Sequence, residues 1–202
     1  MTLVADIVIR RLGRAEYLPT LEAMRRFTRE RDESTADELW LLEHPPVYTL
    51  GQGAAPARVA NGIPVVAADR GGEITYHGPG QVVLYALVDL ARRSIKVKAF
   101  VRLLEQSVID LIGSKAVRRP GAPGVYVDGA KVAALGIRVA RGRAYHGLAL
   151  NVDMDLTPFS AIDPCGYPGL PVTQTRDLAF AGTPAEVGER LAQLVIQGLD
   201  HA

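Results

Sequence analysis

The only cysteine of the chain, Cys165, could act as a nucleophile. It lies in the segment DPCGYPG, where turn-forming residues surround it on both sides. A free cysteine is most often a small buried hydrophobic residue, but such a residue usually has apolar neighbours at periodic positions, which this segment lacks. The segment therefore predicts a loop that holds an accessible sulfur, whose thiolate could attack an activated acyl group.

Three other side chains could assist such a sulfur. Lys131 follows the Asp128-Gly129 turn and begins the apolar run VAALGIRV, where a solvated lysine at a hairpin end is the usual alternative. Spacing alone cannot bring Lys131 to Cys165, since only a fold could do so. His77 and His146 each precede a glycine, and either could be the base of a cysteine–histidine pair or a hydrogen-bonded structural residue.

Metal chemistry is not predicted. One cysteine and scattered histidines show no close spacing of metal ligands, and His44, which precedes two prolines, is expected only to lie in a loop.

The segment RGGEITYHGPGQ, residues 70–81, is predicted to be a binding loop. It holds four glycines and one proline just before an apolar run. Glycine at this density lets the backbone approach a ligand closely and lets consecutive N–H groups share one concavity. An ordinary tight turn is the alternative, but a turn needs neither Arg70 nor His77.

Hydrophobic periodicity predicts the elements that position these residues. Residues 96–112 have one apolar helical face, residues 15–31 have helical spacing, and Thr183, Pro184 and Glu186 form a capping box that begins a last helix at 184–199. QVVLYALVDL at 81–90 is typical of a central strand buried on both faces. Further strands are predicted at 3–10, 38–43, 47–50, 64–68, 125–127, 131–139 and 144–152.

Composition restricts the class of protein. A chain of 202 residues that is 48% hydrophobic fits one α+β domain over 1–202, with a mixed sheet and flanking helices. With 23 basic and 22 acidic residues, nothing predicts a nucleic-acid partner or a membrane surface. No segment has the roughly 20 apolar residues of a membrane span. The unpaired cysteine and the absence of a secretory leader favour a cytoplasmic location.

Four segments in this order resemble the octanoyltransferase (lipoate-protein ligase B) family. They are RGGEITYHGPGQ, GVYVDGAKVAALGIRV, HGLALNVDMDL and IDPCGYPGL, and the resemblance spans about 40–176. Motifs this long and ordered are far more specific than a single glycine loop.

The resemblance implies a fold, a reaction and partners. The fold is that of biotin and lipoate protein ligases. The reaction moves an octanoyl or lipoyl group from acyl carrier protein to one lysine of a lipoyl domain of 2-oxoacid dehydrogenases or of the glycine-cleavage H protein. The cysteine of PCGY, here Cys165, takes the acyl group as a thioester, and the lysine of GAKVAALG, here Lys131, activates it. Because a thioester donor is already activated, no ATP, metal or other cofactor is expected.

The resemblance also implies an acyl pocket. The residues that match its walls are Arg70, Gly71, Gly72, Glu73, Ile74, Thr75, Tyr76, His77, Ala134, Leu135, Gly136, Gly147, Leu148 and Ala149. Three alternatives remain open at this point. An ATP-dependent lipoate or biotin ligase would need no nucleophilic sulfur, a cysteine hydrolase would use Cys165 with His77 or His146, and a noncatalytic binding module would tolerate the loss of Cys165.

Overall fold

The computed structural model describes residues 7–55, 59, 61–113, 115–162, 169–178, 180 and 182–202. Cys165 and the rest of 163–168 lie outside the described residues, as do residues 3–6 of the first predicted strand.

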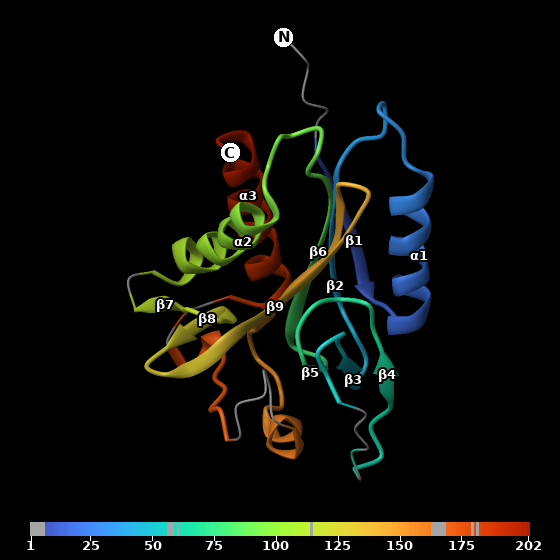
Figure 1. Cartoon of the computed structure of the whole chain (residues 1–202). Helices are drawn as coiled ribbons and strands as arrows, with labels where there is room; N and C mark the ends of the chain where they lie inside the picture. The colour runs from blue at the N-terminus through green and yellow to red at the C-terminus, as the bar shows by residue number, and fades with distance from the viewer. Residues whose placement is uncertain are drawn as a thin grey trace.

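A mixed seven-stranded sheet forms the centre of the fold (Figure 1). Its strand order is β1-β2-β6-β10-β9-β8-β7. β1 is parallel to β2, and every other neighbouring pair is antiparallel. The strands are β1 Val8–Arg14, β2 Glu38–Glu43, β6 Gln81–Asp89, β7 Ala116–Arg119, β8 Ala122–Val127, β9 Ala130–Ala140 and β10 Arg143–Asn151.

Helices cover both faces of this sheet, as Figure 1 shows. α2 (Val97–Ile112) and α3 (Pro184–Asp200) pack on one face, and α1 (Tyr17–Glu30) packs on the other. Side chains of a strand alternate between faces, so β2 sends Leu39 and Leu41 to the first core and Trp40 and Leu42 to the second. Burial on both faces explains the continuous apolar run of β6.

A second, three-stranded sheet lies beside the end of the large one (Figure 1). Its order is β4-β3-β5, with β4 Val65–Ala67, β3 Val47–Leu50 and β5 Ile74–His77. β5 corrects the prediction that the whole of 70–81 is a loop. Ile74 to His77 pair with Leu50 to Val47, because β3 offers a free edge to this β-branched and aromatic stretch.

Several other local predictions are confirmed, although β1 continues to Arg14 past its predicted end at Arg10 and β7 was not predicted. The bounds of β2 and β3 match the predicted ones, and the capping box of Thr183 and Glu186 is present at the start of α3. Both predicted hairpin turns have left-handed residues, with φ of 47° and 87° at Asp128-Gly129 and of 50° and 77° at Arg141-Gly142. No helix among the described residues is both long and apolar enough to cross a bilayer.

Candidate active site

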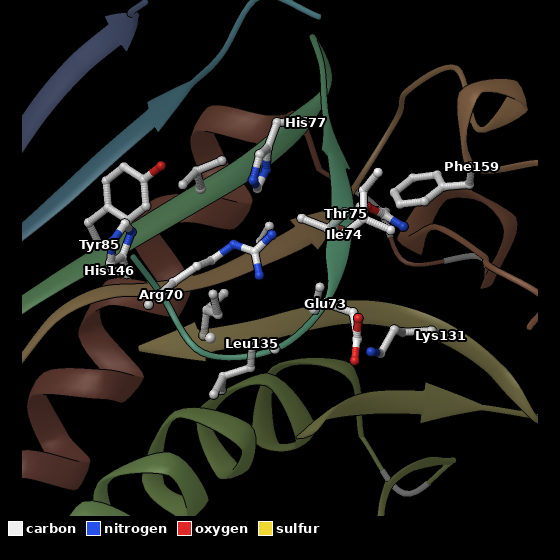
Figure 2. A pocket seen from close by; sticks show the side chains of 18 of the residues that line it. Arg70, Glu73, Ile74, Thr75, His77, Tyr85, Lys131, Leu135, His146 and Phe159 are labelled. Carbon is white, nitrogen blue, oxygen red and sulfur yellow. The ribbon is translucent and has the colours of Figure 1, made fainter. Parts of the chain in front are cut away.

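A pocket opens between the two sheets, and its space, including the open mouth, measures about 730 Å³. Figure 2 shows Lys131 and Phe159 at one end, and Tyr85 and His146 at the other. The residues that line it are Tyr17, Arg70, Gly72, Glu73, Ile74, Thr75, His77, Val83, Tyr85, Lys131, Ala134, Leu135, Gly136, His146, Gly147, Leu148, Ala149, Asn151, Phe159 and Val172.

Lys131 is held at one end of this pocket by its neighbours on the sheet. It is only 4% exposed, and its Nζ lies 5.5 Å from the centroid of the Tyr126 ring on β8, a cation–π contact. Gly124 makes room for the lysine, since a Cβ there would lie 2.8 Å from Lys131 Cε. Glu73 and Lys131 point toward one another across the mouth (Figure 2). The lysine is therefore buried beside groups that suit a cation.

The chain that follows the segment of Cys165 is bonded to Lys131. The Lys131 N–H donates to the carbonyl of Pro171 at 2.8 Å, and the Thr173 N–H donates to the Lys131 carbonyl at 2.9 Å. Val172, between them, lines the pocket. On the preceding side, the 3-10 helix Thr157–Ala161 supplies Phe159 to the same pocket.

The loop of residues 70–73 forms one wall and is fixed on two sides. Arg70 Nη2 donates to both the carbonyl and the hydroxyl of Thr49 at 2.7 Å. The Gly71 N–H donates to the Ile137 carbonyl of β9 at 3.0 Å. A Cβ on Gly136 would lie 2.7 Å from the Gly71 carbonyl oxygen, so only glycine allows this close approach of loop and strand.

Neutral histidines form part of the wall. Burial, with a contribution from the nearby His44, lowers the pKa of His77 to about 3, and burial lowers the pKa of His44 to about 4. Burial also lowers the pKa of His146, although its bond to Asp69 opposes the shift. His77 is therefore a weak base, which disfavours its pairing with Cys165 in the cysteine–histidine alternative.

His44 lies in the loop between β2 and β3, as predicted, but no signal in the sequence indicated how its ring is used. His44 is fully buried, and it bonds to the carbonyl of Ala15 at 2.6 Å and to the hydroxyl of Tyr85 at 2.8 Å. His44 follows directly after β2, and its ring lies in the core between α1 and β6. Sequence reasoning saw only the two prolines after it.

The structure brings most of the predicted pocket residues together. Gly71 and Tyr76 are the exceptions: Gly71 turns its backbone to β9, and the Tyr76 ring packs on Tyr48 and Phe159 beside the pocket. Sequence reasoning also missed Tyr17, Val83, Tyr85, Asn151, Phe159 and Val172. Tyr85 could have been identified from the sequence, because it places a hydroxyl in the middle of an otherwise apolar buried strand.

No group of three or more histidine, cysteine, aspartate or glutamate side chains among the described residues could hold a metal ion. The expectation that the reaction needs no metal or nucleotide stays a prediction.

Comparison with known proteins gives the class first. The family model described as "Lipoyl protein ligase A/B catalytic domain" matches residues 16–195. The fold is shared with a bi-partite lipoate protein ligase from Thermoplasma acidophilum (TM-score 0.71, 18% identity, 96% of this chain and 85% of that one). It is also shared with biotin protein ligase from Aquifex aeolicus (TM-score 0.59, 11% identity, 96% and 70%). The fold is thus that of lipoate and biotin protein ligases.

Sequence relatives narrow the class to one family. The chain is 57% identical over 199 residues to the octanoyltransferase of Dechloromonas aromatica, covering 96% of this chain and 97% of the relative. It is 63% identical over 180 residues to the octanoyltransferase of Thiobacillus denitrificans, covering 87% and 83%. The chain belongs to the octanoyltransferase family and is an acyltransferase.

Proposed function

We propose that this enzyme transfers an octanoyl group from acyl carrier protein to one lysine of a lipoyl domain, through a thioester on Cys165 that Lys131 supports. One observation carries the proposal: a buried lysine stands at the end of a largely apolar pocket, where the described chain on both sides of the Cys165 segment also lines the wall. The names of the relatives supply the octanoyl group, and the family match supplies the context of protein lipoylation.

The first half-reaction would load the enzyme. The Cys165 thiolate attacks the thioester carbonyl of the donor, a new C–S bond forms, and the carrier's sulfur leaves as a thiolate. An unperturbed thiol with a pKa near 8.5 is only a few per cent ionised at pH 7. An ammonium about 4 Å from the sulfur would stabilise the thiolate by about 4 kcal/mol at an effective dielectric constant of 20, which is enough to make it the major form.

The second half-reaction would release the product. The neutral amine of the acceptor lysine attacks the Cys165 thioester, an amide forms, and the Cys165 thiolate leaves. The proton of the attacking amine passes to solvent water as the amide forms, and the Lys131 ammonium stabilises the returning thiolate. Conversion of a thioester to an amide is downhill, so neither step needs a nucleotide. The acceptors are lipoyl domains of 2-oxoacid dehydrogenases and the glycine-cleavage H protein.

Intact-mass measurement after incubation with octanoyl carrier protein tests the proposal. We expect one added octanoyl group without ATP or magnesium, its removal by hydroxylamine, and its discharge onto one lysine when apo lipoyl domain is added. Cys165→Ala should show neither the adduct nor the transfer.

Free octanoate with ATP is the control. Transfer from octanoate and ATP, without transfer from the carrier thioester, would identify an ATP-dependent ligase instead. Substantial turnover by Cys165→Ala would exclude the covalent route.

A further inference from the structure

The end of the pocket away from Lys131 is polar, which is unexpected for a site that takes a hydrocarbon chain. Tyr17 of α1, Tyr85 of β6 and His146 of β10 all line the pocket and are all buried. Figure 2 shows Tyr85 and His146 at the end opposite Lys131. Ring contacts connect the group, with centroid distances of 5.2 Å for Tyr17–His44, 5.9 Å for His44–Tyr85 and 5.9 Å for Tyr85–His146. Tyr17, Tyr85 and His146 are called the inner end below.

The donor and acceptor roles of the His44 and His77 ring nitrogens follow from their hydrogen-bond partners. His44 Nδ1 must donate, because its partner is the carbonyl oxygen of Ala15, so His44 Nε2 accepts from the Tyr85 hydroxyl. His77 Nδ1 donates to Gln81 Oε1 at 2.7 Å, since the amide of Gln81 already uses its nitrogen to donate to Asn151. The hydroxyl proton of Tyr85 is therefore not available to a ligand.

Two other polar atoms in the wall lack a partner among the described residues. His146 Nε2 lies 2.7 Å from the Asp69 carboxylate and donates to it, so Nδ1 carries the lone pair. That Nδ1 is buried and unbonded, in a side chain that is 1% exposed. The Tyr17 hydroxyl is also buried and unbonded. Burial raises the pKa of Tyr17 to about 12, so it remains a donor.

The backbone of His146 has an unfavourable conformation. Its φ is 62°, in the left-handed region that favours glycine, although it lies within a strand. Asp69 also accepts from the Tyr145 hydroxyl at 2.7 Å and from Arg25 Nε at 2.9 Å, so the carboxylate that orients His146 is itself fixed. Buried polar atoms without partners are rare in folded proteins. A strained, oriented acceptor and an unbonded donor in one pocket wall indicate a ligand.

The charges restrict what that ligand can be. The lone pair of His146 Nδ1 would repel a carboxylate. Asp69 favours a positive charge at His146, but its carboxylate is already paired with Arg25 at 2.9 Å. Arg70 disfavours protonation of both His77 and His146 and would repel an ammonium. A neutral hydroxyl fits, because one oxygen can accept a proton from Tyr17 and donate its own to His146.

We propose that the inner end is a subsite for a neutral hydroxyl group, bound between the Tyr17 hydroxyl and Nδ1 of His146, and that the enzyme therefore accepts ω-hydroxyacyl chains as well as octanoyl. With an unsubstituted chain, a water molecule occupies the subsite. With an ω-hydroxy chain, the chain's own hydroxyl replaces that water. The inference rests on the proposed function in one respect, namely that the reacting carbonyl lies at the Lys131 end.

Calorimetry with octanoic acid and 8-hydroxyoctanoic acid tests the subsite without requiring transfer. We expect the intact protein to bind the two acids with similar affinity, and Tyr17→Phe to weaken the hydroxy acid about fivefold to tenfold relative to octanoic acid, the effect of one net hydrogen bond. Tyr17→Phe breaks no bond among the described residues, so its melting temperature should not fall. Thr28→Val is the matched control, since its hydroxyl on α1 is also buried without a partner among the described residues but does not line the pocket, and it should leave the ratio of affinities unchanged.

Crystal structures with each acid separate the two sources of the hydroxyl. An isolated oxygen between Tyr17 and His146 is expected with octanoic acid, and density continuous with the chain is expected with the hydroxy acid. Absence of an oxygen there in both structures, or equal weakening of both acids by Tyr17→Phe, would overturn the subsite. If octanoyl transfer fails while the affinity ratio still responds to Tyr17→Phe, the subsite stands and the proposed function falls.

Discussion

Two buried polar regions, one around Asp37 and one at the inner end of the pocket, differ in the kind of hydrogen bonds they make. Asp37, fully buried before β2, accepts from Arg31 at 2.6 Å, Arg92 at 2.8 Å and Arg93 at 2.6 Å, and from the Asp89 N–H at 2.9 Å. Its carboxylate is saturated by groups at the ends of α1 and β6. The unbonded buried atoms around Asp37 are single nitrogens of Arg31, Arg92 and Arg93, whose other guanidinium nitrogens are bonded. The inner end of the pocket instead keeps the Tyr17 hydroxyl and His146 Nδ1 without a partner among the described residues. The hydrogen bonds of Asp37 stabilise the fold, whereas the unbonded atoms of the inner end can bind a ligand.

The largest effect is expected at the reacting end of the pocket. Lys131→Met should slow transfer by about 10²- to 10⁴-fold, since the thiolate of Cys165 loses its neighbouring cation. The pH profile for alkylation of Cys165 should move to higher pH for the same reason. Rates with octanoyl carrier protein and alkylation between pH 5 and 9 measure both effects.

Lys98→Met, on the exposed side of α2, is the control for loss of a charge. An unchanged alkylation profile in Lys131→Met would show that Lys131 is not the partner of the sulfur.

The Asp37 region should respond in stability instead of rate. Asp37→Asn removes the charge that three arginines share, and breaking a buried ion pair on one side costs about 3–5 kcal/mol. Denaturant unfolding measures the loss, while the transfer rate of the folded fraction should be unchanged. Asp153→Asn is the control, because its pair with Arg176 is exposed and should be worth under about 1 kcal/mol. A rate loss as large as the stability loss would contradict the division between the two regions.

As the pH is lowered, the contribution of the pocket region to stability should be lost at a higher pH than the contribution of the Asp37 region. The pKa of His44 is lowered to about 4 from 6.5, so the unfolded chain binds more protons than the folded one between these values. The free energy of unfolding should therefore have its full value above about pH 6.5 and decrease as the pH drops toward 4, by roughly 3 kcal/mol for His44 alone. The pKa of Asp37 is lowered by its arginines, so its contribution is lost only below about pH 4.

Unfolding curves at half-unit steps from pH 7 to pH 4 measure this slope. His44→Gln should reduce the slope and leave the part due to His77 and His146, and His201→Gln, at the exposed C-terminal end, should not change it. A slope that begins only below pH 4 would assign it to the carboxylates.

Sequence reasoning succeeded where structure follows from local chemistry. The caps of α3, the left-handed hairpin turns and the buried run of β6 each carry their own signal in neighbouring residues. β7, the stretch AVRR, carries no such signal and was missed, because its pairing with β8 decides its conformation.

The candidate site shows the same limit. Resemblance supplied Lys131 and most of the walls, but Tyr17, His44 and Tyr85 come from three separate elements. Their meeting depends on α1 packing on β6, which no spacing in the sequence encodes. The role of Cys165 remains a prediction from the motif, since that residue lies outside the described ones.

The smallest effect is expected on the surface, at the hairpin between β9 and β10. Three arginines there could meet an acidic carrier, but they are not equivalent. Arg143 bonds to the Thr28 carbonyl and lies 3.5 Å from Asp89, and Arg138 donates to Gln52 at 2.8 Å, whereas Arg141 is exposed in the turn.

An exposed charge mainly affects the rate of encounter and is screened by salt. Arg141→Ala should therefore raise the KM for octanoyl carrier protein about twofold to fivefold at low salt, and by less at 0.5 M salt. The kcat, and the rate with a small octanoyl thioester, should be unchanged. Arg29→Ala, on the exposed side of α1, serves as the control. An equal effect on the small thioester would place Arg141 in the support of the pocket instead of on a docking surface.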